Sequence, residues 1–202
     1  MKKIDLLLSG IGGQGVILAS NILAEVAIGF NYDVKKSDTL GMAQRGGAVV
    51  SHIRLADKVK SPLVQKGNVD VLLSFERLEA GRWVEYLSRE GYAIVNNQCV
   101  FPLSVSSGYE AYPSREQMEQ LLETATQRVY FVDALSMAQE MGNQNVVNII
   151  MLGFLSFLLP IDANTWESGI AVRVPPKFRE LNLDAFRKGR SEAERMVGET
   201  SG

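Results

Sequence analysis

The sequence predicts an α/β domain of three layers, in which helices cover both faces of a mixed sheet and further helices follow at the C-terminus. Short apolar runs alternate with longer apolar or amphipathic segments, which is typical of βαβ units. A glycine-rich turn joins the first apolar run to the first long segment. The segment 48–55 instead alternates apolar and polar residues, as antiparallel strands do, so we expect the sheet to be mixed.

The first half of the chain supplies strands, one long helix and a hairpin. The run that opens the chain carries a single charge, and the segment after the glycine turn has few polar residues, so both are expected to be buried. A turn after the alternating segment indicates a return strand, with Pro62 near the sheet edge. The elements are a strand at 4–8, a helix at 16–30, a strand at 32–36 followed by a loop over 37–47, and a hairpin of strands 48–55 and 59–64.

The second half resumes the α/β alternation and then becomes helical. Ser114 followed by Gln117 predicts a capped helix start. After Pro160 the pattern indicates a helical extension of about 162–197 on a single domain spanning 1–202. The expected elements are strands at 69–75, 92–95 and 129–132, and helices at 76–89, from Ser114 onward, at 134–141, 145–159, 162–171 and 183–196.

Size and composition fit a globular domain and exclude several functions. The chain has 202 residues, 46% hydrophobic and 22% charged, with a formal net charge of −2. This balance gives no basic surface for nucleic acid. The most apolar stretch, 149–159, is closed by Pro160 and is shorter than the ~20 residues of a membrane helix. We therefore expect a cytoplasmic protein that contacts neither membrane nor nucleic acid.

The counts of metal-binding side chains argue against a resident cofactor. There is one cysteine, Cys99, and one histidine, His52. Four thiolates normally hold an iron–sulfur cluster, and one thiol with one distant imidazole does not favour zinc. His52 lies inside the alternating segment and is interpreted as a sheet histidine. Cys99 has no basic residue near it in the sequence and is interpreted as an inert thiol.

The glycine turn is the first candidate site. Gly10, Gly12 and Gly15 have the spacing of the dinucleotide fingerprint, with Gly13 and Gln14 between them. Such a turn lets backbone approach a phosphate at the start of a helix. The alternative is a tight strand–helix turn without a ligand. An NAD site would also need an acidic residue about 20 positions on, where Asp38 stands close to that distance.

A second loop, 41–47, carries the remaining candidates. It holds Gln44 and Arg45 before Gly46 and Gly47, and an arginine fork suits a carboxylate or a phosphate. The alternative is a surface loop with one solvated arginine.

Three further polar residues are possible site residues at strand ends. Glu76 and Glu79 follow the strand 69–75, at the rim where α/β sheets bind ligands, although acidic residues there also complement a helix dipole. Asn96 follows the strand 92–95. Asn148, inside an apolar helix, would need a buried partner.

Taken together, the two loops resemble the gamma-type subunits of 2-oxoacid:ferredoxin oxidoreductases. Gly10–Val16 and Gly41–Gly47 carry the resemblance, and the loop 41–47 is most similar to that of the beta (small) subunit of the indolepyruvate enzymes. Thr39-Leu40 departs from relatives, which more often place histidine or tyrosine there. The resemblance continues at Val69 to Leu73, Glu76, Glu79, Asn96, Pro102, Gly142, Asn143, Asn148, Leu152, Gly153, Pro176, Lys177, Glu180, Asn182, Phe186 and Gly189.

This resemblance implies a pyruvate/ketoisovalerate oxidoreductase gamma-type domain of Rossmann-like fold, acting as an accessory subunit. The reaction would be oxidative decarboxylation of an arylpyruvate with coenzyme A and ferredoxin. Thiamine diphosphate and iron–sulfur clusters would belong to a large alpha subunit, and the two glycine loops would line the subunit interface or the approach of coenzyme A. Two alternatives remain: the gamma subunit of a pyruvate, branched-chain or 2-oxoglutarate enzyme, or a free-standing Rossmann-like protein that binds a nucleotide.

Overall fold

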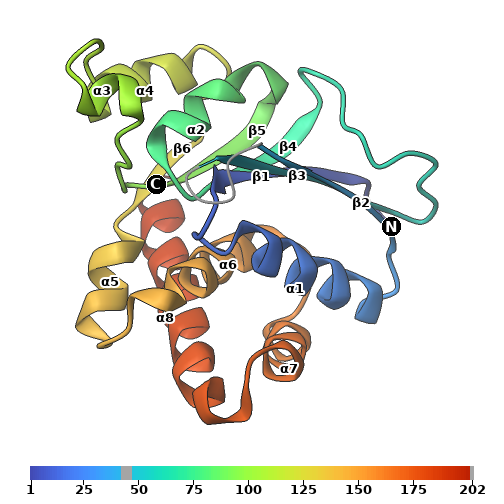
Figure 1. Cartoon of the computed structure of the whole chain (residues 1–202). Helices are drawn as coiled ribbons and strands as arrows, with labels where there is room; N and C mark the ends of the chain where they lie inside the picture. The colour runs from blue at the N-terminus through green and yellow to red at the C-terminus, as the bar shows by residue number, and fades with distance from the viewer. Residues whose placement is uncertain (42–46, 201–202) are drawn as a thin grey trace.

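The computed structural model describes residues 1–41 and 47–200, which fold around a six-stranded sheet with helices on both faces (Figure 1). The strand order is β2-β3-β1-β4-β5-β6. The strands are β1 (Ile4–Ile11), β2 (Asp33–Leu40), β3 (Ala48–Ala56), β4 (Val69–Ser74), β5 (Leu87–Asn96) and β6 (Val129–Val132). The α-helices are α1 (Val16–Gly29), α2 (Arg77–Arg82), α3 (Leu103–Ser106), α4 (Arg115–Glu123), α5 (Ala134–Glu140), α6 (Val147–Leu158), α7 (Ala163–Arg173) and α8 (Arg179–Thr200).

The sheet is mixed, as the sequence predicts, and β1 is its junction. On one side β1 runs parallel to β4, which continues in parallel through β5 and β6. On its other side β1 pairs antiparallel with β3, and β3 pairs antiparallel with β2. Because β1 belongs to both halves of the sheet, the turn at its carboxyl end lies near the centre of the rim.

The predicted hairpin of strands 48–55 and 59–64 does not form. Strand 48–55 is confirmed as β3, but it pairs with β2 and not with 59–64, which forms no strand. The strand expected at 32–36 extends through Leu40, into the segment interpreted as a loop, and occupies that edge of β3. Since β1 covers the other edge, β3 has no free side for a return strand.

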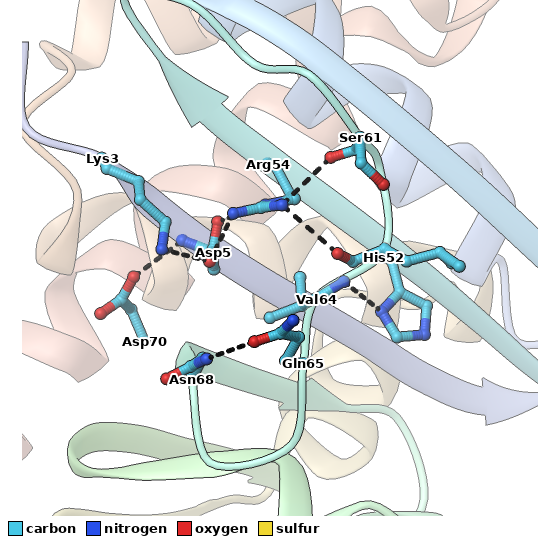
Figure 2. Close-up of polar contacts among 10 residues, drawn as sticks. Lys3, Asp5, His52, Arg54, Ser61, Val64, Gln65, Asn68 and Asp70 are labelled. Atoms are coloured by element: carbon cyan, nitrogen blue, oxygen red, sulfur yellow. Dashed lines mark hydrogen bonds and ion pairs between the residues drawn. The ribbon is translucent and has the colours of Figure 1, made fainter.

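Side chains of β3 hold the segment that follows it (Figure 2). Arg54 reaches Asp5 on β1, where Nε lies 2.9 Å from Oδ1, and its Nη1 donates to the Ser61 carbonyl at 3.2 Å. The Val64 N–H donates to Nδ1 of His52 at 3.3 Å. Asp5 is 1% exposed, so its bond to Arg54 is largely shielded from water. The segment is therefore fixed by charge-assisted and polar contacts in place of a strand ladder.

The helices divide between the two faces of the sheet. Figure 1 places α2 and α4 above the sheet and α1, α6, α7 and α8 below it. The helix expected at 76–89 is shorter, since α2 ends at Arg82 and a turn of 3₁₀ helix, Val84–Tyr86, precedes β5. Leu87, predicted to be helical, instead pairs with Val69 of β4. The capped helix start at Ser114 is confirmed: Ser114 and Gln117 exchange both capping-box hydrogen bonds.

The C-terminal helices are longer than predicted and are packed tightly on the core. The helix expected at 183–196 is α8, which begins at Arg179 and ends at Thr200. It crosses α6 at two glycines, Gly153 and Gly189. A Cβ on Gly153 would stand 2.1 Å from the Phe186 carbonyl oxygen, and one on Gly189 would stand 2.0 Å from the Ile150 carbonyl oxygen. The two backbones meet because neither position has a side chain. Among the described residues, no helix is long and apolar enough to cross a membrane.

The glycine crossing predicts a large difference between three glycine substitutions. Gly153→Ala or Gly189→Ala forces the backbones apart, so we expect each to lower the free energy of unfolding by about 3 kcal/mol. Gly198→Ala, in α8 with no atom within 4 Å of its Cβ, should be neutral or raise it by up to about 1 kcal/mol. Urea unfolding measures all three, and equal effects at Gly189 and Gly198 would contradict the crossing.

His52 predicts a loss of stability in weak acid. Burial lowers the pKa of its imidazole, and protonation of Nδ1 would remove the acceptor of the Val64 N–H. The stability that neutral His52 contributes should therefore be present above the ordinary histidine pKa of about 6.5, and it should be lost as the pH falls below that value. His52→Gln keeps an acceptor without titrating, so the difference in unfolding free energy between wild type and variant should shrink from pH 7.5 to 5. Parallel pH curves would contradict this role.

Candidate functional site

The glycine turn, residues 10–15, begins with the last two residues of β1 and leads into α1, as its spacing predicts. Gly13 and Gly15 adopt left-handed backbone with φ of 105° and 78°, which favours glycine at both positions. A Cβ on Gly10 would lie 2.8 Å from Val16 Cγ2 and 3.1 Å from Phe75 Cβ, so this glycine lets α1 and β4 close on β1. The first glycine thus serves packing, while the later two shape the backbone of the turn.

A polar brace, the side chains of Gln14, Asn96 and Gln98 around the Phe75 carbonyl, holds this turn from inside. Gln14 accepts the Ile11 N–H at 2.8 Å through Oε1, and its Nε2 donates to the Phe75 carbonyl at 3.2 Å and to Gln98 Oε1 at 3.4 Å. Asn96 Nδ2 donates to the same two acceptors at 3.1 and 3.3 Å. Gln14 and Asn96 are therefore turned inward, as supports of the turn. Gln98 is a site residue that sequence reasoning misses, because no local pattern marks it.

Two helix N-termini meet at the glycine turn. No side chain caps α1 at Gly15, and the first-turn N–H groups of Val16, Ile17 and Leu18 have no acceptor among the residues the structure describes. The start of α6 approaches from the other side, where a Cβ on Gly15 would stand 2.5 Å from Asn148 Nδ2. Unpaired N–H groups and the helix dipoles make such a place favourable for an anion.

Asn148 is the polar side chain at this meeting point. It is 5% exposed, and the partner of its Oδ1 is local: this oxygen accepts the N–H of Ile149, the next residue. Its Nδ2 donates to nothing within the described part of the chain and borders a pocket of about 360 Å³. This α1–α6 pocket is lined by Gly13, Gln14, Gly15, Leu18, Gln98, Leu135, Gln144, Asn145, Val147 and Asn148. A donor that borders a pocket without a partner among the described residues is a group to which a ligand oxygen could bind.

A second pocket, of about 530 Å³, lies on the β2 side of the same turn. Apolar side chains dominate its lining, including Val16, Leu18 and Leu40, with glycine backbone between them. Of the second candidate loop, Gly47 is brought to the turn, because the Gly12 N–H donates to its carbonyl at 2.9 Å. Gln44, Arg45 and Gly46 lie outside the described residues.

Glu76 and Glu79 both lie at the end of β4, yet they have different surroundings. Glu76 is buried and caps α2: its Oε2 accepts the Glu79 N–H at 2.9 Å, while its Oε1 accepts from Val100 N–H and the Tyr112 hydroxyl. This hydrogen bonding and burial raise the pKa of Tyr112, burial being the larger cause. Burial also raises the pKa of Glu79, although Arg82, whose Nε lies 3.2 Å from Glu79 Oε1, acts to lower it. Glu76 is thus a structural cap on the side of β4 away from the pockets.

Cys99 has a basic neighbour that its sequence context does not reveal. Arg77 Nη2 contacts the Cys99 sulfur, and the Arg77 guanidinium also lies 5.5 Å from the centre of the Tyr112 ring. The two residues are brought together because the chain returns along β5 to the end of β4. Across residues 1–41 and 47–200, no group of three or more histidine, cysteine or acidic residues is arranged to bind a metal.

The position of Asp38 does not support an NAD site. Asp38 lies on β2, which is separated from β1 by β3, whereas the fingerprint acid follows the strand next to β1. Its two carboxylate oxygens are engaged by Ser51 Oγ at 2.6 Å and Lys36 Nζ at 2.7 Å. The glycine turn is therefore present without the ribose-binding acid that usually accompanies it.

A central glycine turn, two helix N-termini and a brace behind them define a Rossmann-like domain on a mixed sheet. The family model of the pyruvate ferredoxin/flavodoxin oxidoreductases matches residues 5–192. The chain belongs to this family, and the resemblance stated from the paired glycine loops is confirmed.

Curated relatives match over nearly their whole length. The chain is 33% identical to the indolepyruvate oxidoreductase subunit IorB of Thermococcus kodakarensis, over 98% of this chain and 100% of that protein. Identity to the subunit of the same name from Pyrococcus horikoshii is 34%, over 98% and 99%. A 2-oxoglutarate synthase subunit KorC from Methanocaldococcus jannaschii is 29% identical, over 97% and 96%.

Solved structures share the fold. The gamma subunit of a keto/oxoacid ferredoxin oxidoreductase from Geobacter sulfurreducens has a TM-score of 0.69 and 26% identity, over 94% of this chain and 98% of that one. A 2-oxoglutarate:ferredoxin oxidoreductase from Magnetococcus marinus has a TM-score of 0.71 and 20% identity, over 96% of this chain and 32% of that one. The predicted mixed α/β/α fold is confirmed.

The contact between Gly15 and Asn148 predicts coupled effects on stability. Gly15→Ala places a side chain in left-handed backbone, at about 1–2 kcal/mol, and against Asn148 Nδ2, at about 1–3 kcal/mol more. Asn148→Ala removes the clash but not the backbone cost, so the double variant should lose less stability than the two single variants combined. Chemical denaturation of the four proteins measures the coupling. Strict additivity would show that the two residues are not in contact.

Proposed function

We propose that this chain is the small, accessory subunit of an indolepyruvate:ferredoxin oxidoreductase acting in the cytoplasm. The carrying observation is the order of identities: 33–34% to subunits named for indolepyruvate against 29% for a subunit named for 2-oxoglutarate. The full-length coverage of those relatives supports a subunit of the same architecture. The reaction would convert an arylpyruvate and coenzyme A into an aryl-acetyl-coenzyme A and carbon dioxide, with reduction of ferredoxin.

The proposed partner is a large alpha subunit that holds thiamine diphosphate and iron–sulfur clusters. Thiamine diphosphate would supply the carbanion chemistry of decarboxylation, and the clusters would carry electrons to ferredoxin. With one cysteine and one histidine, this chain has too few side chains of the usual kinds to ligate a cluster. Its part would be to bind and orient a substrate at the subunit interface.

We assign the phosphate-rich end of coenzyme A to the glycine turn. The residues present fit such a group: among the described residues, the first-turn N–H groups of α1 have no acceptor, and Nδ2 of Asn148 borders the α1–α6 pocket without a partner. Gly12, Gly13 and Gly15 would present backbone to the phosphates, with Gly10, Gln14 and Asn96 as supports. Gln44, Arg45, Gly46 and Gly47 would line the approach of coenzyme A or the subunit interface. Glu76 and Glu79 stand farther along the rim as interface candidates.

The proposed function predicts that the assembled complex prefers indolepyruvate to other 2-oxoacids. Tagged chain isolated anaerobically from its native host should bring down a brown, iron-containing large subunit. With coenzyme A and thiamine diphosphate present, indolepyruvate should reduce viologen faster than pyruvate or 2-oxoglutarate does. The large subunit alone, prepared in parallel, should be much less active and should regain activity when this chain is added.

Other outcomes would each overturn a defined part of the proposal. A brown partner that prefers another 2-oxoacid would leave an accessory subunit but contradict the indolepyruvate assignment. A fully active large subunit without this chain would contradict the accessory role. Colourless chain that comes down alone and binds NAD in calorimetric titration would replace the proposal with a free-standing nucleotide-binding protein.

A further inference from the structure

A charged hydrogen-bond network joins α1 to the β2 edge of the sheet. The ammonium group of Lys36 on β2 donates to two residues of α1, Ser20 Oγ at 3.1 Å and Asn21 Oδ1 at 2.5 Å. Its third donor goes to Asp38 Oδ2 at 2.7 Å, so every N–H of the ammonium group has an acceptor. Asp38 Oδ1 in turn accepts from Ser51 Oγ of β3 at 2.6 Å. Together these five side chains form the α1–β2 clamp.

The clamp is a more ordered contact than an ion pair between exposed side chains. Ser20 and Ser51 are fully buried, and the side chains of Lys36 and Asp38 are 20% and 26% exposed. The Ser20 hydroxyl also donates to the Ile17 carbonyl at 3.0 Å, which fixes its orientation on the helix. Hydrogen bonds to a charged group are stronger than neutral ones, and partial burial reduces their screening by salt. The clamp therefore holds α1 and β2 at a defined separation.

The clamp lies directly beside the β2-side pocket, which is the pocket of about 530 Å³ next to the glycine turn. Ile17 lines this pocket from α1, and Asn21 follows it by four residues, one turn along the same side of the helix. Leu40 lines it from β2, and Asp38 lies two residues earlier on the same face of the strand. Figure 1 shows α1 lying against this side of the sheet. Both walls of the pocket thus continue into the clamp.

The separation of α1 from β2 determines where the first N–H groups of α1 lie. A helix and a sheet satisfy most of their backbone groups internally, so side chains set the distance between them. Ile17 and Leu18 have N–H groups without an acceptor among the described residues, and both lie within about one turn of the clamp. A movement of α1 away from β2 would displace these N–H groups and widen the β2-side pocket at the same time.

We propose that the α1–β2 clamp positions the first turn of α1 for ligand binding, with Lys36 as its central positioning residue. The inference rests on the proposed function, in which the N–H groups of that turn bind the phosphates of coenzyme A. It gives Asp38 a role in place of the ribose contact that its position does not support. Because the clamp acts only through the position of α1, it should change the binding of coenzyme A without changing the chemical step.

Lys36→Met tests the clamp in the assembled complex. Methionine keeps a long side chain but has no donor for α1 or for Asp38. With saturating indolepyruvate, we expect the KM for coenzyme A to rise at least fivefold, while kcat stays within twofold and the KM for indolepyruvate is unchanged. Lys35→Met is the matched control, because the exposed Lys35 points to the other face of β2, where it lies 3.5 Å from Asp33. Its kinetic constants should be those of the wild type.

Asn21→Ala tests the clamp from the helix side. Alanine favours helix, so the variant should fold with an undiminished thermal midpoint although Lys36 loses one acceptor. The KM for coenzyme A should rise, by a smaller factor than in Lys36→Met, because Ser20 and Asp38 still accept. Asn21→Asp keeps an oxygen acceptor for Lys36 and should bind coenzyme A as the wild type does. A residue that only stabilised the fold would lower the thermal midpoint and leave this KM unchanged.

The outcomes separate the clamp from the function on which it rests. An unchanged KM for coenzyme A in folded Lys36→Met and Asn21→Ala complexes would overturn the clamp and leave the proposed function intact. A loss confined to kcat in Lys36→Met would overturn it as well. If Lys36→Met fails to fold, the comparison of Asn21→Ala with Asn21→Asp decides in the same way. A wild-type complex whose activity does not depend on coenzyme A would overturn both the clamp and the proposed function.

Discussion

The absence of a side chain at Gly15 is the constraint on which the site depends. With no Cβ there, the N-termini of α1 and α6 come together across Asn148, and the α1–α6 pocket opens beside them. Left-handed backbone at Gly13 and Gly15 turns the chain sharply enough to leave the first N–H groups of α1 without acceptors among the described residues. The turn keeps this shape because the polar brace fixes it from the protein interior. The groups that we propose to bind an anion are thus backbone N–H groups, and side-chain amides hold the turn that presents them.

Glycines also allow close backbone contact between the helices behind the site. α6 carries Asn148 at its start and Gly153 farther along, where α8 crosses in backbone contact through Gly189. The C-terminal helices therefore fix the position of α6, and with it one wall of the pocket. β1 connects the parallel and antiparallel halves of the sheet, so its terminal turn stands at the centre of the rim. The glycines thus set how closely α1, α6 and α8 approach one another, and the polar side chains at the turn supply its hydrogen-bonding groups.

Local patterns predict most of the fold. The glycine turn, the buried α1, the capping box at Ser114 and the mixed sheet all follow from short-range spacing. Local patterns do not predict which distant segments pair. The apolar and polar residues of β3 alternate in the same way whether its partner is 59–64 or β2. For the site, Gln98 and the contact of Arg77 with Cys99 arise from neighbouring strand ends, and no sequence interval encodes them. Asn148 stands out in the sequence as a lone amide in an apolar helix, but its unpartnered Nδ2 emerges only from the fold.

Hydrogen exchange on the assembled complex, with and without coenzyme A, tests most directly whether the glycine turn is the ligand site. The amides of Gly13, Ile17 and Leu18 lack acceptors among the described residues and belong to exposed or half-buried residues, so they should exchange fast in the unliganded complex. We expect coenzyme A to slow their exchange at least tenfold, together with the Asn148 side-chain amide. Unchanged exchange at these amides under saturating coenzyme A, with protection appearing elsewhere in the complex, would contradict the assignment.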